Sequence, residues 1–170
     1  METSSLQKNR PHVESVFGGL SEEQDSHIRL RLSEIDVVLL EIAKHFGRES
    51  AGWEGTGLDL KWYPSGQVAI GSFVSASMGN LWVDFGIALR PCWCDGQKAS
   101  ALSWRIETTV SADCQHSDDH GGMDLVREVV SDIDSSPVEA ANAMLSAAHE
   151  LKRLALEFPL GHWLELASDL

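Results

Sequence analysis

The segment Ala101–Ala112, A-L-S-W-R-I-E-T-T-V-S-A, alternates between apolar and polar side chains along its length. Apolar or nearly apolar residues hold its even positions: Leu102, Trp104, Ile106, Thr108, Val110 and Ala112. Polar residues hold the positions between them: Ser103, Arg105, Glu107, Thr109 and Ser111. Successive side chains of a β-strand point to opposite faces of its sheet. We therefore predict a strand with one face in the core and the other facing water or a partner.

Three upstream segments, 58–63, 67–76 and 81–90, alternate in the same way and are separated by residues typical of turns. Together with 101–112 they predict a four-stranded antiparallel meander with one apolar face. A tight turn at 64–66 would set Trp62 opposite Val68. A hairpin closed at Asp95-Gly96, a favoured two-residue turn, would give the following pairs: Leu89 with Leu102, Ile87 with Trp104, and Asp84 with Glu107.

An N-terminal helix over 21–46 is predicted by a capping box and by a long apolar stripe. Ser21 and Gln24 stand three residues apart, as the reciprocal cap requires. Behind them, apolar residues recur every three or four positions: Ile28, Leu32, Ile35, Leu39, Ile42 and Phe46. Gly47 is then the expected end of the helix. Packing on the sheet is the favoured role of the stripe, and a coiled-coil homodimer is the alternative.

The C-terminal part is predicted to form three helices, over 123–133, 137–158 and 160–168. For the first, Met123, Val126, Val129/Val130 and Ile133 favour an amphipathic helix, with a strand as the alternative. For the second, Ser136-Pro137-Val138-Glu139 is a capping box with proline at the first helical position. Pro159 ends that helix and separates it from the last one.

Length and order predict one α+β domain over 21–170, preceded by a flexible lead-in over 1–20, with helices mainly on one sheet face. The chain has 26 acidic and 13 Lys and Arg residues, a formal net charge of −13. This balance argues against nucleic acid, because neutralising phosphates needs clustered basic side chains. Three cysteines and the absence of a long apolar run favour a cytoplasmic protein that does not enter a membrane.

A metal site is the enzyme-like alternative. Cysteine and histidine donors lie near 92–94 and 114–120, but the predicted hairpin separates the two groups by about 40 Å at ~3.3 Å per residue. A local site on the 113–122 loop remains, with His116, Asp118 and His120 as ligands of a metal-assisted hydrolase. No motif for a nucleophile, a phosphate-binding loop or a resident cofactor is present in the sequence, so we expect a protein that is not an enzyme.

The favoured site is instead the polar face of the sheet together with the acidic segment that follows it. Its candidate residues are Trp82, Asp84, Arg90, Arg105, Glu107, Asp118, Asp119, Asp124 and Glu128. We expect an acidic cytoplasmic module that docks or sequesters a protein with a basic surface. A small-ligand binding protein is a further alternative. In size, acidity and element order the chain resembles, at class level only, small bacterial immunity proteins and secretion chaperones.

Overall fold

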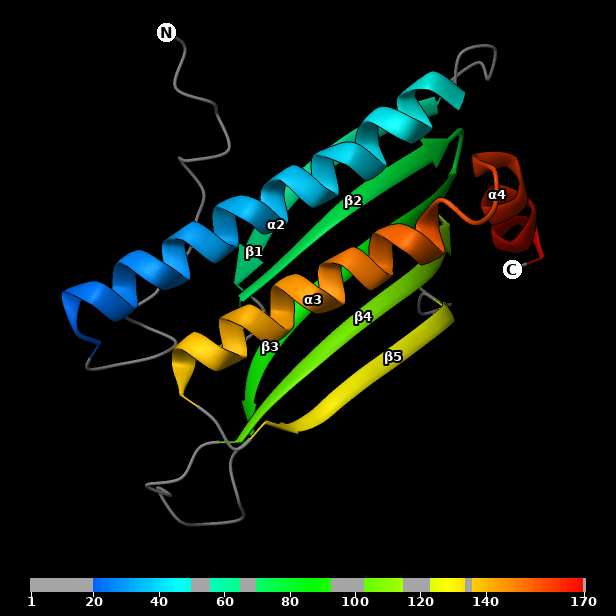
Figure 1. Ribbon diagram of the computed structural model, residues 1–170. Coiled ribbons are helices and arrows are strands. Elements are labelled where there is room, and N and C mark those ends of the chain that lie inside the picture. The colour runs from blue at the N-terminus through cyan, green and yellow to red at the C-terminus, as the bar shows by residue number, and fades with distance from the viewer. Residues whose placement is uncertain are drawn as a thin grey trace, which may run out of the picture.

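The computed structural model describes residues 20–49, 56–64, 70–92, 103–114, 123–133 and 136–169 (Figure 1). Helix α2 spans Glu22–Glu49 and precedes five strands. The strands are β1 (Thr56–Pro64), β2 (Ile70–Met78), β3 (Leu81–Cys92), β4 (Ser103–Cys114) and β5 (Met123–Ile133). Helices α3 (Pro137–Ala155) and α4 (Leu160–Ser168) follow them. The predicted lead-in over 1–20 lies outside the described residues except for Leu20.

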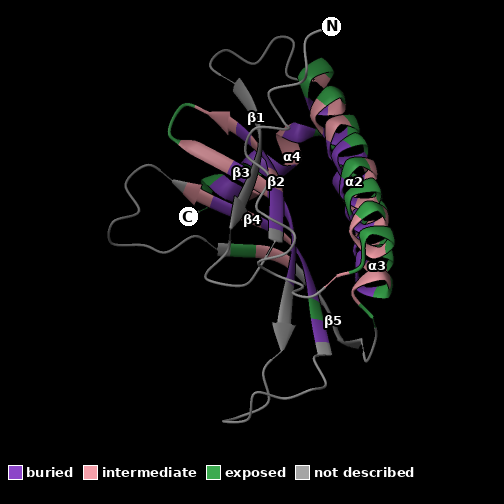
Figure 2. Ribbon diagram, turned by 90° about the vertical axis from the view of Figure 1, so that its left-hand side faces the viewer, coloured by how far each residue is buried: buried purple, intermediate pink, exposed green. Residues whose placement is uncertain are grey.

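The five strands form one antiparallel sheet in sequence order, so each strand pairs with its neighbour in the chain. Helices α2 and α3 lie side by side over one face of this sheet, and α4 packs near one end (Figures 1 and 2). The α+β class, the N-terminal helix, the four predicted strands and the two last helices are confirmed. None of the described helices is both long enough and apolar enough to span a membrane.

The prediction of a helix over 123–133 is wrong, because this segment is strand β5. Two register shifts in its pairing with β4 interrupt the period of two. The positions opposite the buried even residues of β4 are Met123, Val126, Glu128, Val130 and Ile133, at spacings of three, two, two and three. Each shift inserts one extra residue on β5, and because Glu128 is polar, the apolar residues recur at spacings of three, four and three. The sequence pattern was therefore real but had a different cause.

The predicted registers of two hairpins are also wrong, both by four residues. Leu89 pairs with Ile106 rather than Leu102, and Trp62 pairs with Ser72 rather than Val68. An even shift returns every side chain to its expected face, so the apolar pattern satisfies both registers equally. The pairing of β3 with β4 ends at Cys92 and Ser103, which leaves residues 93–102 as the connection. The predicted Asp95-Gly96 turn lies outside the described residues.

Both predicted capping boxes stand at helix starts. The backbone N–H of Gln24 donates to Oγ of Ser21 (3.2 Å), and the backbone N–H of Ser21 donates to Oε1 of Gln24 (3.0 Å). At α3, the backbone N–H of Glu139 donates to Oγ of Ser136 (3.3 Å). These bonds satisfy backbone donors that a helix start leaves without intrahelical partners. Local sequence therefore sets where α2 and α3 begin.

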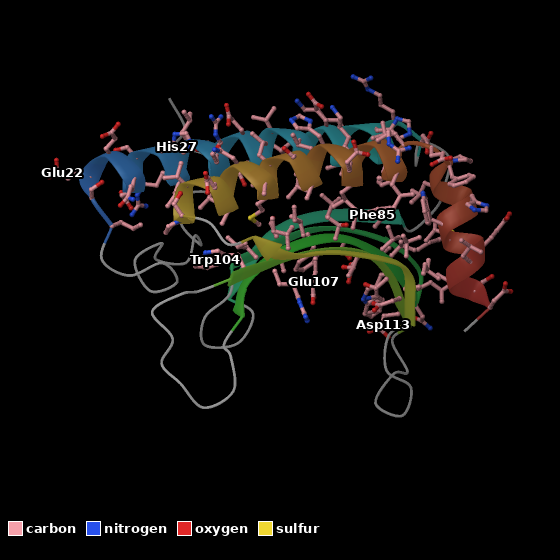
Figure 3. All side chains as sticks on the ribbon, turned by 60° about the horizontal axis from the view of Figure 1, so that its bottom comes forward. Glu22, His27, Phe85, Trp104, Glu107 and Asp113 are labelled. Carbon is pink, nitrogen blue, oxygen red and sulfur yellow. The ribbon has the colours of Figure 1, made fainter. Side chains whose placement is uncertain are left out.

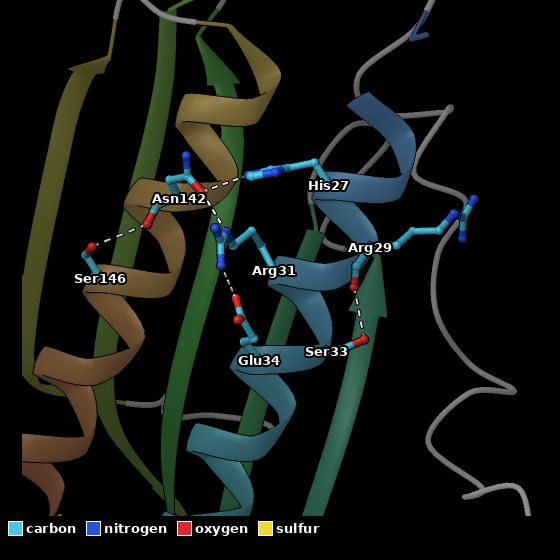
Figure 4. A network of polar contacts seen from close by, with 7 residues as sticks. All are labelled: His27, Arg29, Arg31, Ser33, Glu34, Asn142 and Ser146. Atoms are coloured by element: carbon cyan, nitrogen blue, oxygen red, sulfur yellow. Dashed lines mark hydrogen bonds and ion pairs between the residues drawn. The ribbon is translucent and has the colours of Figure 1, made fainter. Parts of the chain in front are cut away.

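Helices α2 and α3 are joined by polar contacts along the side of the pair that faces away from the sheet (Figure 4). Oδ1 of Asn142 on α3 accepts from Nε of Arg31 (2.7 Å) and lies 3.0 Å from Nε2 of His27, both on α2. Further along, Lys152 of α3 forms an ion pair with Glu41 of α2. These contacts fix the position of α3 relative to α2 along the helix axes.

The core lies between the helices and the sheet. Phe85 of β3 is its centre, with its ring 4.8 Å from that of Phe46 on α2 and 5.5 Å from that of Trp163 on α4. Nε1 of Trp163 donates to the carbonyl of Ala155 (3.2 Å), so this buried indole has a partner for its one polar atom. The apolar stripe of α2 is buried as predicted: Ile28, Leu32, Ile35, Leu39, Ile42 and Phe46.

Helix α2 continues past Gly47 to Glu49, three residues beyond the predicted range of 21–46. The Glu49 carboxylate accepts the backbone N–H of Leu160 through Oε2 (2.7 Å), and its Oε1 lies 2.8 Å from Nε2 of His45. Helix α4 begins after Pro159, whose side chain supplies no cap. A carboxylate at a helix N-terminus is also favoured by the helix dipole. The side chain of Glu49 therefore caps α4 from a distant part of the chain.

We expect Glu49→Ala to destabilise the protein by about 1 kcal/mol, the usual cost of losing a helix cap. Chemical denaturation followed by circular dichroism measures the change. Glu165→Ala is the matched control, because Glu165 is exposed on α4 and its side chain takes no part in this cap. Equal destabilisation by the two substitutions would contradict the capping role.

The ion pair between Glu41 and Lys152 predicts a pH dependence. The hydrogen bond from Lys152, and then the charge of the same ammonium group, lower the pKa of Glu41 below its usual value. A lowered pKa in the folded state contributes stability at neutral pH that is lost as pH falls through that pKa. We expect Glu41→Gln to be slightly less stable than wild type at neutral pH and equal to it in acid. Urea unfolding at the two pH values tests this, and a difference that persists in acid would contradict it.

Candidate functional site

The face of the sheet opposite the helices is the candidate site. On β4 the even residues Trp104, Ile106, Thr108, Val110 and Ala112 are buried, as the alternation predicts. The intervening residues face the other way, and no described helix covers them (Figure 2). The sheet is curved, with its concave side away from the helices, and Glu107 points out from that side (Figure 3). We call this surface the concave face.

One row of paired residues crosses all five strands and contains only aspartate and serine. In strand order the row is Asp59, Ser75, Asp84, Ser111 and Asp124. Strands lie about 4.8 Å apart, so the aspartate positions recur about every 10 Å across the sheet. Serine hydroxyls both donate and accept hydrogen bonds, whereas ionised carboxylates only accept. Its four described side chains, those of Ser75, Asp84, Ser111 and Asp124, therefore provide acceptors for a positively charged partner.

A pocket of about 220 Å³ opens at the centre of this row, and we call it the Asp84 pocket. It is lined by residues of three strands: Phe73, Asp84, Gly86, Thr109 and Ser111. Oδ1 of Asp84 is buried from solvent, although the residue as a whole is only partly buried. The lining combines a carboxylate, two hydroxyls and one aromatic ring. That combination suits a cationic group carried on an apolar stem.

Gly86 accounts for part of the space in the Asp84 pocket. A Cβ atom at this position would lie 3.1 Å from Oγ1 of Thr109 and 3.8 Å from Cβ of Phe73. Glycine inside a strand weakens the sheet, and it commonly marks a close approach to another group. The backbone of Gly86 does not adopt a positive φ. Glycine at this position therefore matters for the space that a missing Cβ leaves, and not for an unusual backbone conformation.

Glu107 and Arg105 lie further along the concave face of β4. The side chain of Glu107 is only 8% exposed, while that of Arg105 is 47% exposed, and their charged atoms are 4.0 Å apart. A largely buried carboxylate beside a half-exposed guanidinium is partly neutralised. The two charges of this pair therefore largely balance each other on the concave face.

The structure separates several candidate residues that the sequence prediction brought together. Asp84 pairs with Ser111 rather than Glu107, which lies four residues further along β4, about 13 Å away at ~3.3 Å per residue. The facing carboxylate pair, and with it an acid–base pair at this point, is therefore excluded. Trp82 is opposite Asp113, and the backbone position of Arg90 is opposite Arg105.

The acidic segment is only partly described. Asp124 is exposed on β5, where it forms one end of the row, and Glu128 pairs with Thr108 by its backbone. The predicted residues Asp118 and Asp119, and the metal candidates His116, Asp118 and His120, lie outside the described residues. Cys92 and Cys114 stand at opposite ends of the hairpin. Within the described ranges, no three His, Cys, Asp or Glu residues are grouped closely enough to hold a metal ion.

Sequence reasoning missed four of the five residues that line the Asp84 pocket: Phe73, Gly86, Thr109 and Ser111. All four are uncharged and carry no motif of their own. The one available signal was Gly86, a glycine in the interior of a predicted strand. Only the observed register brings it beside Phe73 and Thr109.

Comparison of the chain with protein-family models, with curated proteins and with solved structures found no match in any of the three.

Proposed function

We propose that this protein is an acidic binding module that docks a protein with a basic surface on its concave sheet face. The observation that carries the proposal is the row Asp59, Ser75, Asp84, Ser111 and Asp124, which crosses a face that no described helix covers. A formal net charge of −13 adds long-range attraction for a positive partner. Charge of this kind raises the rate of association and selects the sign of the partner.

The curvature of the sheet supports the same proposal. A concave surface concentrates the electrostatic field of the charges along it more than a flat one does. By backbone register, the positions of Lys61, Arg90, Arg105 and Arg127 fall on this face as well. The proposal therefore depends on the continuous row of aspartate and serine positions and not on a lack of cations on the concave face.

A small-ligand binding protein is less well supported. Sites for drug-sized ligands commonly measure about 300–1,000 Å³, whereas the Asp84 pocket measures about 220 Å³. A larger hollow of about 460 Å³ lies where α2 meets α4. Its Glu49 carboxylate is already engaged by the Leu160 N–H and by His45. The Asp84 pocket is therefore below the usual size, and the larger hollow, which His162 and Glu165 also line, has its Glu49 carboxylate committed to the cap of α4.

Affinity capture from a native lysate, with the purified protein as bait, tests the proposal when it is carried out at low and at high salt. We expect a basic protein to be retained at low salt and released at high salt, because exposed charges are screened. The double variant Asp84→Asn/Asp124→Asn should lose most of that protein. Mass spectrometry identifies it, and titration of the two purified proteins measures the affinity.

The control is Glu23→Gln/Glu150→Gln, which also removes two negative charges, but from exposed positions on α2 and α3. It should retain the captured protein nearly as well as wild type. Equal loss in both double variants would show that only net charge matters and would contradict docking on the concave face. So would a captured protein that high salt does not release.

A further inference from the structure

We propose that the Asp84 pocket receives one arginine side chain of the docked partner, with its guanidinium against Asp84. The proposal rests on the docking surface proposed above and adds the chemical group at its centre. Docking surfaces commonly concentrate binding energy in a few anchor residues, and arginine is enriched among them. The Asp84 pocket lies at the middle strand of the acidic row, which is where such an anchor is expected.

The polar lining of the pocket matches the donors of a guanidinium. Arginine carries five N–H donors in a planar fork and no acceptor. Facing them are the Asp84 carboxylate and the hydroxyl groups of Thr109 and Ser111, all of which accept. The carboxylate of Asp84 and the hydroxyl of Ser111 come from directly paired residues, and Thr109 stands two positions further along β4. A planar fork can therefore meet acceptors from two adjacent strands.

The apolar part of the lining favours arginine over lysine. Phe73 is directly opposite Gly86 on the neighbouring strand, and its side chain lines the same pocket. A guanidinium stacks on an aromatic ring and is more weakly hydrated than an ammonium group. A lysine ammonium would have to give up a stronger hydration shell to enter. The aromatic wall therefore selects for the planar cation.

The volume of the pocket limits the occupant to a group of side-chain size. At about 220 Å³ the space lies below the range for whole small-molecule ligands. Gly86 keeps part of that space open, since a Cβ there would lie 3.1 Å from Oγ1 of Thr109. A larger side chain at position 86 would occupy the place of the entering guanidinium. This gives a substitution that blocks the pocket and leaves the charge of the chain unchanged.

Nuclear magnetic resonance titration with two small probes tests the proposal. N-acetyl-arginine methylamide is the ligand, and N-acetyl-citrulline methylamide is its neutral counterpart of nearly the same shape. We expect the arginine probe to shift the backbone amide signals of the five pocket residues, with saturation in the millimolar range that suits a single charge-assisted contact. The citrulline probe should bind at least tenfold more weakly, and a lysine probe more weakly than arginine.

Two variants locate the binding. Asp84→Asn and Gly86→Val should each weaken the arginine probe at least tenfold, whereas Glu23→Gln on α2 should not. The undisturbed signals of α3 in each spectrum show that the variant is folded. Equal binding of arginine and citrulline, shifts spread over other surfaces, or full binding by Gly86→Val would overturn the proposal. Lysine bound as well as arginine would overturn the stacking argument and with it the choice of arginine.

These outcomes separate the pocket from the docking surface. If the probe fails to bind but the captured partner is still lost in Asp84→Asn/Asp124→Asn, the pocket proposal is wrong and docking stands. If the probe binds as expected but no salt-sensitive partner is captured, docking of a basic protein is wrong and the pocket is a guanidinium site of another kind.

Discussion

The packing of Phe85 between Phe46 and Trp163 is the contact on which the rest of the structure depends. It joins the central strand of the sheet to the C-terminal half of α2 and to α4, which are more than a hundred residues apart in the chain. Burying aromatic side chains contributes strongly to the stability of a small domain. Because the odd residues of β3 are buried in this core, its even residues face the concave side. Asp84 is one of those even residues, so the burial of Phe85 places the Asp84 pocket on the concave face.

Much of the fold could be predicted because it depends on local patterns of apolar and polar residues in the sequence. The period of two in 101–112 and the stripe from Ile28 to Phe46 each define an element and the face that it buries. The two capping boxes identify the residue at which each helix starts, because a capping box depends only on residues three positions apart. The end of α2 was missed, because Glu49 is held by Leu160 from a distant part of the chain.

The candidate site was harder to predict, because it depends on register. A shift of four residues leaves every face unchanged but replaces Glu107 by Ser111 as the partner of Asp84. Asp84, Arg105 and Glu107 all lie on the concave face, yet the predicted pairing of Asp84 with Glu107 does not form. The pocket combines residues of β2, β3 and β4, each of them unremarkable in its own segment. Long-range pairing, rather than any motif, creates the site.

The register shifts of β5 have a second effect, at the edge of the sheet. Within the described ranges β5 pairs only with β4, so the backbone N–H and C=O groups on its outer side have no partner strand there. Such an edge is a template on which the strand of another chain can add. An extra residue at two points interrupts the even spacing of those groups and increases the local twist. The same irregularity that contributes to the helix-like sequence of β5 thus also makes it a poor site for uncontrolled strand addition and aggregation.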